Sequence, residues 1–310
     1  MKRFLIKIVL LTLAFVVVNM VMLFSVPRDK NHYMRTYSAK IQQLDATPPP
    51  RIIFIGGSNI PFGISSPVIA DSLHRPVIDL GLQAGIGARY LLKDCLPYVR
   101  KGDVVVLQLE YEHFYGTNKG DQEVFLLFLL ENNWRNWTQL DAIQWKFVLA
   151  DIPTQAIANM KRVRRYLRKH TFDTPIQGDK FDYVKSGFNK WGDEVSHLHF
   201  PSTYTPSVIP TNKVVDKDFI NWMDHILNQY EKAGAKVLML PPVCVKSQYA
   251  SSYSEDIGRE LHRIGRPYVT SPDALVLDDS LAFNTGYHLN AKGVEKNTQR
   301  IISILSQHLP

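Results

Sequence analysis

The sequence predicts an α/β fold built on a parallel sheet, preceded by an N-terminal transmembrane helix. Short, uniformly apolar and β-branched runs alternate along the chain with longer amphipathic segments. This alternation is typical of parallel strands whose two faces are covered by helices. A long apolar segment stands before the first of these runs. Residues at the carboxyl ends of the strands are therefore the first place to look for function, because open α/β sheets bind their ligands there.

The apolar segment covers residues 4–25 and carries one charge, Lys7. A helix of this length extends roughly 33 Å, which is enough to cross the core of a bilayer. Lys2 and Arg3 precede the segment. The positive-inside rule therefore places the N-terminus in the cytoplasm and the rest of the chain in the periplasm of a bacterium or outside the cell.

A cleaved signal peptide is the alternative to a membrane anchor. Such peptides have an apolar region of about 7–15 residues and a cleavage site made of small residues. The segment here is longer, and residues 23–27, Leu-Phe-Ser-Val-Pro, make a poor cleavage site. We therefore expect residues 1–27 to form a single-pass anchor in the bacterial cytoplasmic membrane.

A juxtamembrane linker is expected over residues 28–50. Residues 31–44 have mixed polarity and can form a short helix, and the run Ala-Thr-Pro-Pro-Pro at 46–50 ends it. Proline runs form stiff, extended spacers. The folded domain is therefore expected over residues 51–310.

The apolar runs predict the strands of this domain, and the amphipathic segments predict its helices. Strands are expected where apolar, β-branched runs are closed by turn-forming residues, namely at 52–55, 76–80, 104–109, 237–241 and, as a short strand, 267–270. Helices are expected where amphipathic segments join them, namely at 65–73, 89–98, 216–233, 254–264 and 291–309.

Residues 116–215 interrupt this alternation. Within them, residues 124–130 are strongly apolar but too short to span a bilayer, which indicates core packing. Residues 171–210 are rich in Gly, Pro, Asp and aromatic side chains and have no clear period. The region is either a cap over the edge of the sheet or a second lobe with no part in the site.

The net charge of +7 is modest, but six basic residues fall within residues 161–169. This cluster is either a solvated helix face or a contact for anionic lipid headgroups or an acidic envelope polymer. Nucleic acid is not expected as a partner of a chain exported across a membrane. The two cysteines, Cys95 and Cys244, both lie among apolar residues, so we expect buried free thiols. The sequence has no metal-binding motif, and no metal or cofactor is expected.

Ser58 is the first candidate site residue. It follows a predicted strand and two glycines, Gly56 and Gly57. Glycines there let a substrate approach the backbone closely, and a serine at the start of a helix gains from the helix dipole and can offer its own N–H to an oxyanion. Taken alone, Ser58 can equally be a helix cap.

His288 is the second candidate, because it stands immediately before the C-terminal helix. A serine after the first strand and a histidine before the last helix can meet at one edge of a parallel sheet. The pair then predicts a nucleophile, Ser58, and its general base, His288.

These segments resemble the motifs of the SGNH (GDSL-like) hydrolase superfamily. Residues 53–59, Ile-Phe-Ile-Gly-Gly-Ser-Asn, are similar to its first block, with Ser58 as nucleophile. Residues 79–85 are similar to the second block, in which Gly85 would offer its N–H to the oxyanion hole, and residues 284–293 to the last block, with His288 as base. The resemblance implies a flavodoxin-like three-layer α/β/α fold. The membrane anchor adds a likeness to envelope O-acyl-transfer accessories, which implies an acylated glycan or related envelope substrate and a membrane acyltransferase as partner.

The sequence departs from this family at two positions. An Asp usually stands three residues before the histidine, where this chain has Thr285 with Asn284 beside it. In a serine protease, changing the corresponding Asp to Asn lowers turnover by about 10⁴. The third block normally supplies an Asn as oxyanion donor, and the strand at 104–109 is followed here by Glu110.

Glu110 cannot act as an oxyanion donor while it is ionised, because a carboxylate repels the developing negative charge. It can orient His288 in place of the missing Asp, bind substrate, or be an ordinary loop carboxylate. Asn59, beside the nucleophile, is a substitute oxyanion donor.

The sequence thus predicts a membrane-anchored SGNH-type serine esterase or O-acyltransferase that acts on a cell-envelope glycan. A catalytically inactive SGNH-like domain, which binds a glycan or scaffolds a membrane acyltransferase, is the alternative. A purely structural extracytoplasmic domain is the third possibility.

Overall fold

The computed structural model describes most of the chain, namely residues 1–24, 29–132, 137–138, 140–170, 181, 183–206 and 213–309. The end of the predicted anchor and parts of the predicted 116–215 region lie outside these residues.

The centre of the fold is a parallel four-stranded sheet with the order β2-β1-β3-β4. Its strands are β1 (Ile52–Gly56), β2 (Val77–Asp79), β3 (Val104–Gln108) and β4 (Lys236–Met239). Every residue of β1 and β3 is buried, because both strands lie inside the sheet and are covered on both faces. The predicted α/β class and its four main strands are confirmed.

The short strand predicted at 267–270 does not form. One parallel bridge joins Tyr268 to Met239, and Pro267 beside it has no N–H to extend the ladder. A separate two-stranded parallel ladder instead pairs β5 (Cys244–Val245) with β6 (Val276–Leu277).

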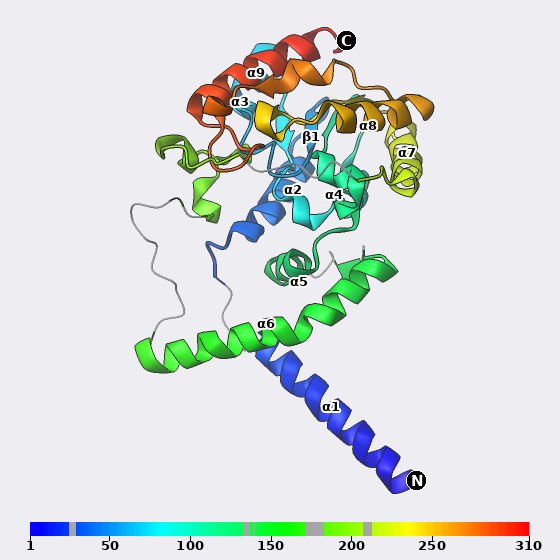
Figure 1. The fold of residues 1–310 in the computed structure, drawn as a ribbon, viewed down its shortest axis with the longest axis vertical. Coiled ribbons are helices and arrows are strands. Elements are labelled where there is room, and N and C mark those ends of the chain that lie inside the picture. The colour runs from blue at the N-terminus through cyan, green and yellow to red at the C-terminus, as the bar shows by residue number, and fades with distance from the viewer. Residues whose placement is uncertain are drawn as a thin grey trace.

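Helices pack on both faces of the sheet (Figure 1). Ile52 and Phe54 of β1 belong to the apolar cluster that includes residues of α3 (Ser66–Leu73) and α9 (Ala291–Ser306). The alternate residues of β1 pack instead against α2 (Thr36–Ala46), α4 (Ala88–Cys95) and α7 (Lys217–Lys232), and α8 (Ser251–Arg263) lies beside α7.

Helix α2 lies within the segment that was expected to be a linker, and it is part of the folded domain. Tyr37 and Leu44 are buried in the main apolar cluster. Lys40 is buried as well, with its Nζ 3.2 Å from the carboxylate of Asp79 at the end of β2. The juxtamembrane segment is therefore fixed to the sheet edge that carries the candidate site.

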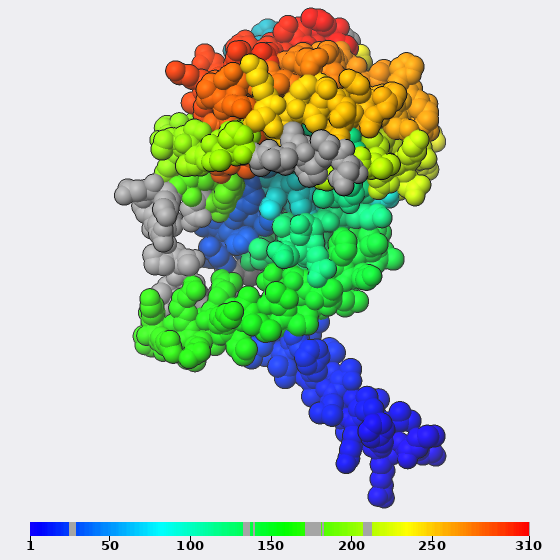
Figure 2. Space-filling model, in the orientation of Figure 1, coloured from blue at the N-terminus to red at the C-terminus, as the bar shows by residue number. Residues whose placement is uncertain are grey.

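Three further helices lie on the anchor side of the sheet (Figure 1). α1 (Lys2–Phe24) is, among the described residues, the one helix long and apolar enough to cross a membrane. α6 (Ala142–Lys169) lies crosswise between α1 and the rest of the domain, and Figure 2 shows α1 projecting from the molecule beyond it. α5 (Gln122–Glu131) lies between α6 and the domain, and five of the seven residues at 124–130 are buried, which confirms that this run packs in the core.

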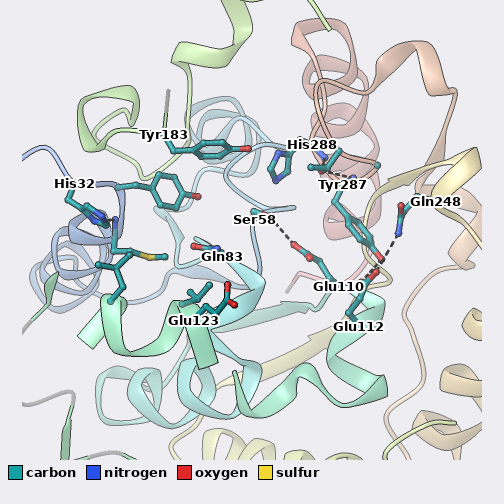
Figure 3. A pocket seen from close by; sticks show the side chains of 16 residues that line it. His32, Ser58, Gln83, Glu110, Glu112, Glu123, Tyr183, Gln248, Tyr287 and His288 are labelled. Atoms are coloured by element: carbon teal, nitrogen blue, oxygen red, sulfur yellow. Dashed lines mark hydrogen bonds between the residues drawn. The ribbon is translucent and has the colours of Figure 1, made fainter. Parts of the chain in front are cut away.

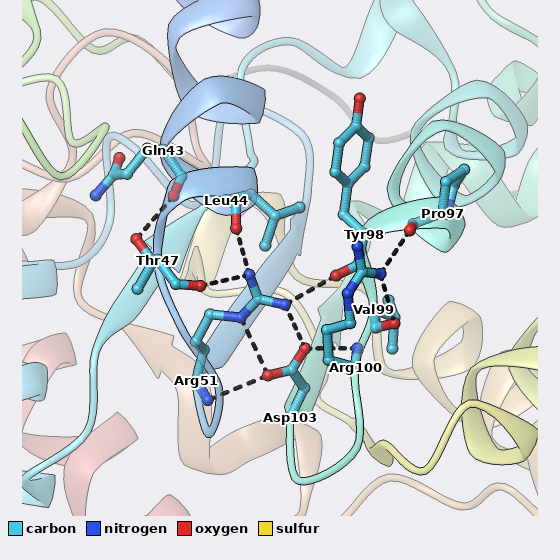
Figure 4. A network of polar contacts seen from close by, with 9 residues as sticks. All are labelled: Gln43, Leu44, Thr47, Arg51, Pro97, Tyr98, Val99, Arg100 and Asp103. Carbon is cyan, nitrogen blue, oxygen red and sulfur yellow. Dashed lines mark hydrogen bonds and ion pairs between the residues drawn. The ribbon is translucent and has the colours of Figure 1, made fainter.

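A buried ion pair joins α2, β1 and the turn before β3 (Figure 4). The guanidinium of Arg51 donates from Nε and Nη2 to the two carboxylate oxygens of Asp103, at 3.1 and 2.6 Å. It also donates to the carbonyls of Leu44, Thr47 and Tyr98. Arg51 is 2% exposed, so the pair is removed from water and held by a complete set of partners.

Replacing Arg51 by Met is therefore expected to lower the free energy of unfolding by about 3 kcal/mol, because it leaves the Asp103 carboxylate buried without its counter-ion. Denaturant unfolding of the full-length protein in detergent measures this change. Arg100→Met is the matched control, since the Arg100 guanidinium is exposed and donates only to nearby carbonyls, and its loss should cost less than about 1 kcal/mol. Equal effects for the two variants would contradict the prediction.

Candidate functional site

A cavity of about 720 Å³ lies at the carboxyl ends of the strands, and Ser58, Glu110 and His288 all line it. The juxtamembrane residues His32, Tyr33 and Met34 and three residues of α5 complete the wall on the anchor side. In Figure 3, Ser58 lies between His288 and Glu110. The topology thus brings three residues singled out in the sequence to one place, from positions far apart along the chain.

Ser58 follows β1 and the glycine pair, and its hydroxyl is hydrogen-bonded to Glu110. Ser58 Oγ donates to Glu110 Oε1 at 3.2 Å, and the backbone N–H of Asn59 donates to the same oxygen at 3.1 Å. A Cβ added to Gly57 would collide with the Glu110 carboxyl group, so glycine is what allows this approach. Glu110 Oε1 therefore accepts hydrogen bonds from both the Ser58 hydroxyl and the Asn59 N–H.

The protonation state of Glu110 is set by this environment. Burial raises its pKa to about 7, and the nearby negative charge of Glu112 acts in the same direction. The hydrogen bonds from Asn59 and Ser58 lower the pKa but do not offset burial. Glu112 is itself held by Tyr287, whose hydroxyl donates to Oε2 at 2.8 Å. Near neutral pH, Glu110 therefore exists in both its protonated and its ionised form.

His288 is held in one orientation on the other side of Ser58. Its ring stacks on Phe62 with centroids 4.0 Å apart and an interplanar angle of 11°. Its Nδ1 lies 2.7 Å from Asn284 Oδ1, and Asn284 Nδ2 donates to the hydroxyl of Tyr183 at 2.8 Å. In this orientation the amide oxygen faces the imidazole, which assigns the ring proton to Nδ1. Nε2 is left with a free lone pair.

The imidazole of His288 is neutral at physiological pH. Burial lowers its pKa to about 3, and the neighbouring His197 adds to the effect. A neutral ring with a free Nε2 has the chemistry of a general base, although in this structure the Ser58 hydroxyl donates to Glu110 and not to His288. The partner on Nδ1 is an amide, however, which stabilises the resulting imidazolium less than a carboxylate does.

Asn284, the partner of His288 Nδ1, had no predicted role in the sequence. Glu110, which was considered as a replacement for the missing Asp, contacts Ser58 and Asn59 instead. Thr285, at the position of the family's Asp, accepts the backbone N–H groups of Tyr287 and His288 through its hydroxyl. The position of Asn284 could have identified it, because an amide or acid side chain four residues before a histidine can reach the imidazole.

Asn59 and Gly85, the expected oxyanion donors, are not among the residues that line the cavity. The side chain of Asn59 is fully buried and donates to the carbonyl of Gln108 at 3.0 Å. Gly85 lies in a short turn, where its carbonyl accepts the N–H of Asp121 at 2.7 Å, and the nearby Gln83 reaches the cavity wall. The donors next to Glu110 Oε1 are instead the hydroxyl of Ser58 and the backbone N–H of Asn59.

The cavity brings together groups that acyl transfer uses. It combines the hydroxyl of Ser58 and the oriented neutral imidazole of His288, and the Asn59 N–H donates to Glu110 in its wall. Within the part of the chain that the structure describes, no group of three or more His, Cys, Asp or Glu side chains could hold a metal ion. Cys95 and Cys244 are buried free thiols, as predicted.

The sequence matches no protein-family model, and no curated protein matches it significantly. The case for a function therefore rests on the chemistry of the cavity itself.

Proposed function

We propose that the protein is a membrane-anchored serine esterase or O-acyltransferase of SGNH type, acting on an acylated glycan or a related substrate of the bacterial cell envelope. The single observation that carries the proposal is that Ser58 and His288 line one cavity, in which Nδ1 of His288 lies 2.7 Å from Asn284 Oδ1. The strand order β2-β1-β3-β4, with helices on both faces, supports a flavodoxin-like three-layer fold.

In the proposed reaction, the hydroxyl of Ser58 turns from Glu110 towards His288. Nε2 takes the hydroxyl proton as Oγ attacks the carbonyl carbon of the acyl group. The tetrahedral intermediate collapses when His288 returns this proton to the leaving alcohol, and an acyl ester remains on Ser58. Water or a sugar hydroxyl then gives a proton to His288 and attacks the ester. His288 returns this proton to Ser58 Oγ as the acyl–oxygen bond breaks, which releases the acid or the new ester and restores Ser58.

The negative oxygen of the intermediate would occupy the place where Glu110 Oε1 now accepts hydrogen bonds. The N–H of Asn59 already points to this place. Protonated Glu110 can add an O–H donor there, in the role that the third-block Asn has in the SGNH family. Ionised Glu110 opposes the reaction, because its charge repels the oxyanion.

A second candidate function is a catalytically inactive domain that binds a glycan or scaffolds a membrane acyltransferase. Two observations favour it: the Ser58 hydroxyl is bonded to a carboxyl group, and the partner of His288 is an amide. Both weaken the nucleophile relative to a complete triad.

Labelling with a fluorophosphonate probe separates the two functions. The full-length protein in detergent is treated with the probe and read by intact mass, and we expect one adduct. Ser58→Ala should give none, and His288→Ala should label about 10²- to 10⁴-fold more slowly. Ser252→Ala, which changes an exposed serine of α8, is the matched control and should label like the wild type. Folded protein without an adduct would favour the inactive, binding function.

A further inference from the structure

One side of α6 exposes a line of apolar side chains. Leu149, Ile157, Met160 and Leu167 are 62, 50, 51 and 71% exposed. Their spacing places them close together along one side of the helix. Four large apolar side chains exposed in line are unfavourable in water and mark a surface that contacts something apolar.

The other side of α6 is occupied by the protein itself. Gln144, Val148 and Asp151 are buried on the side that meets α5. Asn159 is also buried, and its Nδ2 donates to the carbonyls of Met22 and Leu23 at the end of α1, at 3.0 and 3.1 Å. The exposed apolar side chains therefore lie on the part of α6 that these contacts leave uncovered, although Ala156 within the same line is buried. Figures 1 and 2 show α1 leaving the molecule beside α6.

Basic residues gather in the C-terminal half of α6, where Arg164 and Arg168 adjoin the apolar line and the others lie further round the helix. The cluster comprises Lys161, Arg162, Arg164, Arg165, Arg168 and Lys169, and all but Arg162 are exposed. A helix with an exposed apolar side bordered by Lys and Arg is typical of helices that lie in the surface of a membrane, where basic residues meet anionic headgroups.

We infer that α6 lies in the headgroup layer of the same bilayer that α1 crosses, with Leu149, Met160 and their neighbours inserted and the basic cluster on anionic lipid phosphates. Continuity with α1 identifies the occupant of this surface as lipid. The hydrogen bonds of Asn159 to the end of α1 hold α6 where an apolar helix would enter the membrane. The inference holds whether or not Ser58 is a nucleophile.

Docking of α6 also fixes the position of the cavity relative to the membrane. The cavity wall includes Tyr33 and Met34, shortly after α1, and Val124 and Leu127 of α5, the helix that packs on α6. A docked α6 therefore holds the cavity close to the lipid surface, where an acyl donor or acceptor attached to a lipid would be presented.

Site-specific labels on the full-length protein in lipid vesicles test this placement. An environment-sensitive fluorophore is attached to Leu149→Cys or Met160→Cys, in vesicles of phosphatidylglycerol and phosphatidylcholine. We expect quenching by a nitroxide on the lipid chains and protection from aqueous iodide. Labels at Ala158→Cys, an exposed position of α6 outside the apolar line, and at Ser252→Cys on α8 are the controls. A Met160 label that iodide reaches as readily as the Ser252 label would overturn the inference.

The contribution of the basic cluster is tested by removing two charges. Arg165→Gln/Arg168→Gln, carrying the Met160→Cys label, should lower the docking equilibrium in anionic vesicles about fivefold for each charge. Lys292→Gln/Lys296→Gln removes two exposed charges from α9 and should have no effect. Unchanged docking of the Arg165/Arg168 variant would overturn the assignment of this cluster to lipid phosphates.

Discussion

Asn284→Asp is expected to raise the rate at which a fluorophosphonate labels Ser58 by about 10³- to 10⁴-fold. The Asn284 amide oxygen lies 2.7 Å from His288 Nδ1, so an Asp side chain of the same shape would put a carboxylate on that nitrogen. The carboxylate stabilises the imidazolium that forms when Ser58 loses its proton. The magnitude follows from a serine protease, in which the reverse change lowers turnover by about 10⁴.

The environment of Asn284 can accept this substitution. The Tyr183 hydroxyl, which accepts a hydrogen bond from the Asn284 amide, can turn to donate to a carboxylate. The new charge should also raise the pKa of His288 from its present value of about 3. The lower limit of the labelling pH profile should therefore move to higher pH, which a change in folding alone would not produce.

Thr285→Asp is the matched control for this variant. It places the acid three residues before His288, where the SGNH family has it. In this structure, however, the Thr285 hydroxyl accepts the backbone N–H groups of Tyr287 and His288. No gain in rate is therefore expected. A gain for Thr285→Asp and none for Asn284→Asp would contradict the assigned orientation of the ring.

The contrast between these two residues shows how far the sequence could predict the site. The meeting of Ser58 and His288 at one cavity was predictable because each adjoins a regular element with a strong pattern, the buried strand β1 and the amphipathic helix α9. The role of Asn284 was not, because it depends on the path of the loop before α9. An antiparallel bridge between Ala282 and Leu289 folds this loop back on itself, and spacing along the chain does not reveal such a bridge.

The same limit applies to the fold. β1 and β3 were predictable since burial on both faces demands uniformly apolar strands. The packing of α2 was not, because it depends on a contact distant in sequence, the buried pair of Lys40 with Asp79. The linker expected over residues 28–50 followed from local polarity and prolines, and local polarity does not reveal the partner of a buried lysine.

Glu110→Gln is expected to raise the labelling rate at pH 9 about 10²-fold over the wild type. The pKa of Glu110 is about 7, so two pH units above it only about 1% of the wild-type protein has the protonated carboxyl. The remainder has a carboxylate among the oxyanion donors. The Gln amide is neutral at every pH and keeps an N–H donor. The wild-type rate should fall as the pH rises through about 7, and the Glu110→Gln rate should not.

The stability of the wild type relative to Glu110→Gln should also change with pH, in a direction that the pKa shift of Glu110 sets. Burial raises the pKa of Glu110 from 4.5 to about 7, so the folded state holds a proton between these values that the unfolded state has lost. The contribution of Glu110 to stability is therefore lost as the pH rises from about 4.5 to about 7, by about 3 kcal/mol. The depressed pKa of His288 acts in the opposite direction, but it is common to both proteins and cancels in their difference.

Glu112→Gln is the control that separates ionisation of Glu110 from a general effect of the substitution. The charge of Glu112 helps to raise the pKa of Glu110. Removal of this charge should move the upper limit of the labelling pH profile to lower pH, but the fall in rate above that limit should remain.

A rise in the labelling rate with pH, in place of the expected fall, would assign a different role to Glu110. If the wild-type rate rose through pH 7 and Glu110→Gln abolished that rise, Glu110 would be the base that takes the proton of Ser58, since their oxygens lie 3.2 Å apart.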